Sequence, residues 1–262
     1  MELGGRAWRG YFPVGAELTS GIADQKEGLY FGAELDESHP KVRAKTPLHG
    51  RNLFPEDSDL RAIVLDYMDA MTGLGRRVME TMALSLGLEV HFFSRLYTEE
   101  PLILFRIFNY PPLAGGSASA WSVGEHTDYG LLTMLLQDDS GGLEVKSPTG
   151  WIEAPPVPSS FVCNIGDMLE RMTGGLYRST PHRVRNVSGR DRLSFPFFFD
   201  PNWDAKIGAL HTIDNIDTSR VAENNAAARW DGTSVHAFDG TYGDYIISKV
   251  SHVFPELRRD VL

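Results

Sequence analysis

Residues 124–145 read GEHTDYGLLTMLLQDDSGGLEV. The apolar run 131–137 ends at the turn residues 138–142, and a second apolar run follows at 143–146. Apolar runs of about four to eight residues between clusters of Gly, Asp and Ser indicate buried β-strands. Similar runs occur elsewhere in the middle of the chain, at 102–108, 161–165, 182–186 and 193–199. Many short strands at close spacing predict a sandwich or jelly roll.

The segments on either side of this strand-rich region have other patterns. From Ser58 to Leu86 apolar residues recur at three- and four-residue steps, which predicts a long amphipathic helix. A shorter helix is expected at 89–96, and a last helix from Tyr242 to Phe254. Residues 1–57 are rich in Gly, Pro and charge and are expected to be dominated by loops. The polar segment 214–230 is expected to form a loop or a short helix.

The chain has 262 residues, which fits one large domain. We expect a mixed, mainly β fold in which a jelly-roll core is flanked by α-helices. Within a single domain 1–262, the expected parts are a loop-rich start (1–57), a helical part (58–100), the core (101–201) and a C-terminal loop and helix (202–262).

The composition argues against several classes of protein. The net charge of −10 disfavours nucleic acid and anionic membranes as partners, because both select basic faces. No apolar stretch is long enough to span a membrane, and residues 1–6 lack the apolar core of a signal peptide. The one cysteine, Cys163, excludes an intramolecular disulfide, and we expect its thiol to be buried. These features predict a cytoplasmic protein and do not exclude a small anionic substrate.

His126 and Asp128 are candidate metal ligands. Side chains at i and i+2 share one face of an extended segment, so both can reach a single ion. His182 comes 54 residues after Asp128 and starts another predicted strand. Two imidazoles and one carboxylate on one face of an octahedron leave positions for a bidentate co-substrate and dioxygen, which favours iron(II). Zinc would also accept these ligands, but the zinc-enzyme motif H-E-x-x-H is absent from the sequence.

Arg192 and Ser194 are the second candidate pair. They alternate along a predicted strand and therefore point the same way. A guanidinium and a hydroxyl together suit a carboxylate, which the guanidinium binds as a charge-assisted fork. A surface salt bridge is the other interpretation of Arg192, and the nearby metal motif makes it the weaker one.

The order of these motifs resembles that of the isopenicillin N synthase-like 2-oxoglutarate/Fe(II) dioxygenases. The resemblance runs from about Arg106 to Pro201. It implies a distorted double-stranded β-helix flanked by helices, in a single oxygenase domain. It rests on His126-Thr127-Asp128, Leu132-Thr133-Met134-Leu135-Leu136-Gln137-Asp138, Gly142-Leu143-Glu144-Val145, Asn164-Ile165-Gly166-Asp167, Thr180-Pro181-His182-Arg183-Val184 and Arg192-Leu193-Ser194.

The resemblance also implies an activity and its cofactors. His126, Asp128 and His182 would bind Fe(II), and Arg192 and Ser194 would bind the C5 carboxylate of 2-oxoglutarate. With O2, such an enzyme hydroxylates or desaturates a small organic molecule and releases succinate and CO2, with ascorbate as a further candidate reductant. Two alternatives stay open. One is an oxidase of the isopenicillin N synthase or aminocyclopropane-carboxylate type, which uses no 2-oxoglutarate, and the other is a truncated, inactive relative that acts as a binding module.

Two departures from the family pattern bear on the site. Many relatives supply an Asn and a Tyr to the co-substrate from the strand that corresponds to residues 106–111; here Tyr110 matches the Tyr, but Phe108 stands at the usual Asn position. We expect Arg106, Phe108 and Phe198 to line the substrate pocket. Relatives also carry a further segment before residues 9–11, including a strand that joins the main sheet. Its absence from this chain leads us to expect an uncovered sheet edge and, through it, a homo-oligomer.

Overall fold

The computed structural model describes residues 2–19, 21–56, 59–112, 121–210 and 234–253. The helices are η1 (Glu2–Ala7), α1 (Pro40–Arg43), α2 (Leu60–Ser85), α3 (Phe92–Leu96), α4 (Asp167–Met172), η3 (Val235–Ala237) and α6 (Tyr242–Val253). The strands are β1 (Gly10–Phe12), β2 (Leu18–Thr19), β3 (Ile22–Ala23), β4 (Glu27–Gly32), β5 (Pro101–Tyr110), β6 (Val123–His126), β7 (Leu132–Gln137), β8 (Leu143–Ser147), β9 (Gly150–Glu153), β10 (Val162–Ile165), β11 (His182–Val184) and β12 (Arg192–Asn202).

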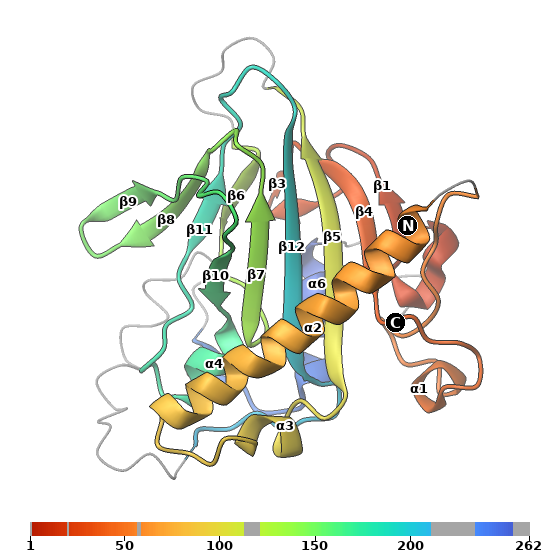
Figure 1. The fold of residues 1–262 in the computed structure, drawn as a ribbon, viewed down its shortest axis with the longest axis vertical. Coiled ribbons are helices and arrows are strands. Elements are labelled where there is room, and N and C mark those ends of the chain that lie inside the picture. Colours follow the sequence, from red (N-terminus) through yellow and green to blue (C-terminus); the bar gives the residue numbers. More distant parts are fainter. Residues whose placement is uncertain (1, 20, 57–58, 113–120, 211–233, 254–262) are drawn as a thin grey trace.

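Two antiparallel sheets form the core (Figure 1). The larger sheet has the order β1-β4-β5-β12-β7-β10, and the smaller one has the order β6-β11-β8-β9. Between β5 and β12 the chain passes repeatedly from one sheet to the other, so that β5, β7, β10 and β12 lie in the larger sheet. This path is that of a double-stranded β-helix. The mainly β jelly roll that the sequence predicts is therefore confirmed.

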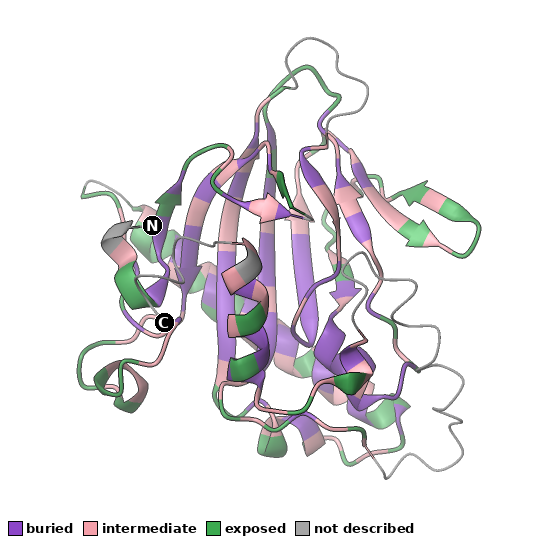
Figure 2. Cartoon of the chain, turned by 180° about the vertical axis from the view of Figure 1, so that it is seen from behind, coloured by how far each residue is buried: buried purple, intermediate pink, exposed green. Residues whose placement is uncertain are grey.

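Helices cover the larger sheet on both faces. Helix α2 crosses one face diagonally (Figure 1), and its buried side chains recur at the predicted three- and four-residue steps, as at Val64, Met68 and Met71. Helix α6 lies across the opposite face, which is seen in Figure 2, and buries Tyr242 and Ile246. The long helix and the last helix predicted from the sequence are thus confirmed. None of the helices in the described part of the chain is long and apolar enough to cross a membrane.

Residues 1–57, which the sequence predicts to be rich in loops, also contribute β4 to the larger sheet, where it pairs with β5 along its whole length. Gly28 and Gly32 resemble turn residues in the sequence, but both serve close packing. A Cβ at Gly28 would lie 2.2 Å from the carbonyl oxygen of Ile107, and one at Gly32 would lie 2.0 Å from Nη2 of Arg9. The edge strand beyond β4 is β1, and pairing of that edge with a second copy stays a prediction.

Two other expectations have different outcomes. The thiol of Cys163 is exposed rather than buried, because β10 is the outer strand at the far edge of the larger sheet. The segment 214–230, for which a loop or short helix is expected, lies outside the described residues.

Gly75 marks the closest approach of α2 to the sheet. A Cβ on Gly75 would lie 2.6 Å from Cδ2 of the buried Phe199 ring on β12. Gly73, which lies earlier in the same helix, has open space where a Cβ would stand. The two glycines therefore differ in packing while sharing one helix.

This contrast gives a test of the packing between α2 and β12. Gly75→Ala should lower the free energy of unfolding by about 1–3 kcal/mol, because overpacking outweighs the gain in helix propensity. Gly73→Ala should raise it by about 0.5–1 kcal/mol, since it gains propensity without a clash. Urea denaturation of both variants measures the difference, and equal changes of the same sign would contradict the packing.

Candidate metal centre and adjoining cavity

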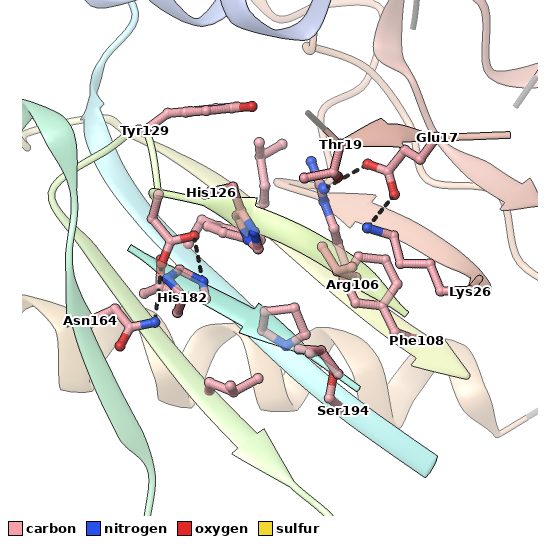
Figure 3. A pocket seen from close by; sticks show the side chains of 18 of the residues that line it. Glu17, Thr19, Lys26, Arg106, Phe108, His126, Tyr129, Asn164, His182 and Ser194 are labelled. Atoms are coloured by element: carbon pink, nitrogen blue, oxygen red, sulfur yellow. Dashed lines mark hydrogen bonds and ion pairs between the residues drawn. The ribbon is translucent and has the colours of Figure 1, made fainter. Parts of the chain in front are cut away.

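The three predicted metal ligands lie together where β6 meets β11. In this antiparallel pair His182 stands directly opposite His126, and the centroids of the two rings are 4.3 Å apart. Asp128 follows β6 by two residues and returns its carboxylate to the same point. Each of the three side chains offers one ligand atom within 4.8 Å of the other two. The arrangement thus presents two imidazoles and one carboxylate to a single position (Figure 3).

Backbone contacts fix which nitrogen of each imidazole faces that position. Nδ1 of His126 lies 2.9 Å from the carbonyl oxygen of Gly124, and Nδ1 of His182 lies 3.1 Å from that of Thr180. A carbonyl only accepts, so Nδ1 carries the proton in both rings and Nε2 keeps its lone pair for a metal. Burial and the neighbouring His182 lower the pKa of His126 to about 3, which keeps this ring neutral.

Strand β10 holds the carboxylate of Asp128, and the start of α4 holds its backbone. Nδ2 of Asn164 donates to Oδ2 of Asp128 at 3.3 Å, and the backbone N–H of Asp167 donates to the Asp128 carbonyl at 2.8 Å. The other carboxylate oxygen, Oδ1, lies 3.7 Å from Nε2 of His182. Asp128 and Asn164 are both buried. One carboxylate oxygen is therefore fixed by an amide, while the other faces the histidines.

A cavity opens from this metal-ligand cluster between the two sheets. Strands β5 and β12 supply alternate residues to its wall, which is the two-residue period of a strand. The residues contributed by these two strands are Leu104, Arg106, Phe108, Tyr110, Arg192, Ser194, Pro196, Phe198 and Asp200. All the site residues predicted from the sequence, including the three metal ligands, line this one cavity. Because side chains alternate along a strand, every second residue of β5 and of β12 faces this cavity.

Arg192, Ser194 and Tyr110 form one polar group on the cavity wall. Arg192 stands opposite Tyr110 across the β5–β12 pair, and the hydroxyl of Ser194 donates to that of Tyr110 at 3.4 Å. Arg192 is fully buried. Its Nε donates to the carbonyl of Gly141 at 2.6 Å and its Nη2 to Oε1 of Gln137 at 3.1 Å. These two bonds fix the plane of the guanidinium.

The third nitrogen of this guanidinium fits an anionic ligand. Nη1 of Arg192 is buried and has no hydrogen-bond partner among the described residues. An unpartnered cationic donor is costly inside a protein, and a carboxylate that also accepts from the hydroxyls of Ser194 and Tyr110 would satisfy it. The donor set therefore suits the distal carboxylate of 2-oxoglutarate. The triad likewise has the ligand types that iron(II) takes in oxygenases.

The other end of the cavity carries charged residues that no sequence motif marks. Glu17 and Lys26 are both buried, and Nζ of Lys26 lies 2.7 Å from Oε2 of Glu17. Burial alone would raise the pKa of Glu17, but Lys26 and Arg106 hold it below its ordinary value. Neither Glu17 nor Lys26 belongs to a motif or a periodic pattern. The pairing of β4 with β5, together with the hydrogen bond from the Gln25 N–H to the carbonyl of Ser122, brings this segment to the cavity.

Arg183 lies beside the metal-ligand cluster in sequence but outside the cavity lining. Its Nε donates to Oε2 of Glu144 at 2.7 Å, and its guanidinium stacks on Trp121 and Trp151 with Cζ 3.8 Å from each ring centroid. Arg183 is thus a structural cation in the described fold.

Comparisons with known proteins agree with this geometry. The model of the 2OG-Fe(II) oxygenase superfamily matches residues 99–201. A probable iron/ascorbate oxidoreductase of Dictyostelium discoideum is 52% identical over 100% of this chain and 77% of that protein. A 1-aminocyclopropane-1-carboxylate oxidase of Dictyostelium mucoroides is 38% identical over 98% of this chain and 77% of its own. The crystal structure of a full-length Neurospora crassa protein in complex with alpha-KG and thymine matches with a TM-score of 0.74 and 26% identity, covering 94% of this chain and 75% of that one.

Asn164 provides a test of how the carboxylate is held. Asn164→Ala should weaken cobalt(II) binding about 10- to 100-fold, because the carboxylate of Asp128 loses the partner that orients it. Asn52→Ala removes another buried asparagine, whose amide bonds Gly32 far from the metal ligands, and should leave the affinity unchanged. Isothermal titration with cobalt(II) compares the two. Equal affinities in Asn164→Ala and the wild type would show that Asn164 does not position the ligand.

Proposed function

Because the chain belongs to the 2OG-Fe(II) oxygenase superfamily, we propose that it oxidises a small organic molecule with O2 and 2-oxoglutarate, releasing succinate and CO2. In this proposal His126, Asp128 and His182 hold Fe(II), while Arg192, Ser194 and Tyr110 hold 2-oxoglutarate. The oxidation is a hydroxylation or a desaturation. Ascorbate, which the name of the Dictyostelium discoideum relative mentions, is the proposed additional reductant.

One observation carries this proposal: the triad and an incompletely partnered arginine share a single cavity. The ligand atoms of the triad lie within 4.8 Å of one another. Arg192 lines the same cavity with a buried Nη1 that has no hydrogen-bond partner among the described residues. A ligand that carries a metal-chelating group at one end and a carboxylate at the other would engage both. 2-Oxoglutarate has this form.

The chain's own residues bind and orient the metal and the ligand, and they exclude water from the site. When bound, Fe(II) supplies the activation of O2 and the oxidative chemistry that amino-acid side chains lack. The imidazoles are pre-oriented because their Nδ1–H groups donate hydrogen bonds to backbone carbonyls. Arg192 is fixed in its plane by Gly141 and Gln137 before a ligand arrives, so little conformational entropy is lost on binding. Apolar side chains of α6, Ile246 and Val250, line the opposite wall and exclude water.

An oxidase that does not consume 2-oxoglutarate is the second candidate. The 38% identity to an aminocyclopropane-carboxylate oxidase over nearly the whole chain favours it. In that case Arg192 and Ser194 would bind another carboxylate. A catalytically inactive binding module is the third candidate, and the close approach of all three metal ligands weighs against it. The partner that we propose in every case is a small molecule.

The role of Arg192 can be tested by binding alone. Arg192→Met should weaken 2-oxoglutarate binding to the cobalt(II)-loaded protein at least about 30-fold, or about 2 kcal/mol, because it removes one partner of a buried ion pair. Arg192→Lys keeps the charge but loses the planar fork, and its affinity for 2-oxoglutarate should lie between those of the wild type and Arg192→Met. Calorimetry measures both variants, with unchanged cobalt(II) affinity as the control for folding. Wild-type affinity for 2-oxoglutarate in Arg192→Met would contradict the assignment.

The consumption of 2-oxoglutarate separates the first two candidates. With Fe(II), ascorbate and air, the wild type should slowly convert 2-oxoglutarate to succinate even without a prime substrate, and His182→Ala should not. Succinate is measured by mass spectrometry after rapid quenching. If the iron-loaded protein binds 2-oxoglutarate but releases no succinate, either alone or with a broad mixture of metabolites, the oxidase becomes the better proposal.

A further inference from the structure

Arg106 sits on the cavity wall at the end away from Arg192. It alternates with Phe108 and Tyr110 along β5 and faces the same space. In Figure 3 its guanidinium lies beside Thr19 and Glu17, across the cavity from His126. Its side chain keeps 19% of its surface exposed, whereas Glu17 keeps 4%. Among Glu17, Lys26 and Arg106, which all line this end of the cavity, Arg106 is therefore the most exposed side chain.

One edge of this guanidinium is already engaged. Nη1 of Arg106 donates to the hydroxyl of Tyr30 at 3.0 Å and lies 3.5 Å from Oε1 of Glu17. The ring of Tyr30 lies 4.0 Å from Cζ, and the ring of Phe198 lies 5.1 Å from it. These contacts fix the guanidinium in position without using its other edge.

The neighbouring charges satisfy one another. Nζ of Lys26 contacts Glu17 at 2.7 Å and Asp24 at 2.8 Å, and the hydroxyl of Thr19 donates to Asp24 at 2.8 Å. Lys26 is buried. Lys26, Glu17 and Asp24 therefore act as a support for Arg106, and their charged atoms are already engaged.

The other edge of Arg106 is available to a ligand. Its Nε and Nη2 have no hydrogen-bond partner within the described residues, and the N–H groups of this edge point in parallel, as a carboxylate requires. The hydroxyl of Tyr129 points into the same cavity from the opposite wall (Figure 3) and likewise has no hydrogen-bond partner in the described part of the chain. Three N–H or O–H donors thus face one space.

We propose that Arg106, helped by the hydroxyl of Tyr129, binds a carboxylate of the prime substrate, so that the enzyme oxidises a small carboxylic acid with an apolar body. The proposal rests on the proposed function, because it assumes that the triad holds iron and Arg192 holds 2-oxoglutarate. Glu17 and Tyr30 are positioning residues, since they hold the engaged edge of Arg106.

The remaining lining supports an apolar body rather than a second charge. Between Arg106 and the metal ligands the wall consists mainly of apolar side chains, among them Leu104, Phe198, Ile246 and Val250. Asp200 also lines the cavity, and its Oδ1 has no hydrogen-bond partner among the described residues, but burial raises the pKa of this carboxyl to about 7 and Tyr242 donates to its Oδ2. A cationic group on the ligand would meet the full positive charge of Arg106 against this weakly ionised carboxyl. A carboxylate at Arg106 would instead direct the apolar carbons of the same molecule along this wall toward the metal ligands.

Binding of paired acids and amides tests the proposal. The probes are hexanoic, octanoic, phenylacetic and 3-phenylpropanoic acids, each beside its primary amide, titrated calorimetrically into cobalt(II)-loaded protein with and without 2-oxoglutarate. In the wild type, the best acid should bind at least tenfold more tightly than its amide. Arg106→Gln should abolish this preference, and Arg106→Lys should keep part of it, because a point charge attracts the carboxylate without the fork.

The controls separate this proposal from the proposed function. Arg76→Gln removes another half-buried arginine, which bonds the carbonyls of Thr98 and Glu99 outside the cavity, and should keep the full preference for acids. Cobalt(II) and 2-oxoglutarate affinities of each variant report on the metal and co-substrate sites independently. Equal affinity for acids and amides, no acid binding at all, or an unchanged acid preference in Arg106→Gln would overturn the role of Arg106. Failure to bind 2-oxoglutarate would instead overturn the proposed function, while the titrations without it still report on Arg106.

Discussion

The antiparallel pairing of β6 with β11 is the constraint on which the site depends. It places His126 and His182 directly opposite each other, with their ring centroids 4.3 Å apart. Backbone carbonyls at Gly124 and Thr180 then turn both Nε2 atoms toward the carboxylate of Asp128. A shift of one residue in this pairing would send one imidazole to the other face of the sheet and leave no triad.

The same two-residue period organises the rest of the cavity. Strands β5 and β12 lie side by side, and each presents alternate residues to the cavity. Arg192 therefore stands at one end of the wall and Arg106 at the other, with the metal ligands facing the space between them. The α2 helix supports the other face of this sheet, because Gly75 lets it pack closely on the buried ring of Phe199. The larger sheet thus positions the two arginines, and the smaller sheet positions the metal ligands that face them.

Much of this site could be predicted from sequence because it depends on short-range periodicity. The spacing of Arg192 and Ser194 places both on one face of β12, and the spacing of His126 and Asp128 predicts that both reach one ion, although Asp128 lies just beyond the end of β6. Glu17 and Lys26 could not be found this way, since they reach the cavity through tertiary contacts such as the pairing of β4 with β5. β4 could not be predicted as a strand because it contains Gly28 and Gly32. Glycine occurs both in turns and where backbone packs closely, so its presence does not distinguish the two.

We propose that one cavity binds both Fe(II), through His126, Asp128 and His182, and 2-oxoglutarate. Anaerobic titration of the Fe(II)-loaded protein with 2-oxoglutarate, followed by visible absorption, tests it most directly. The account predicts one iron per chain and a weak charge-transfer band that saturates at one 2-oxoglutarate per iron and disappears in His182→Ala. Iron that binds without producing this band, or that binds equally well to His182→Ala, would contradict it.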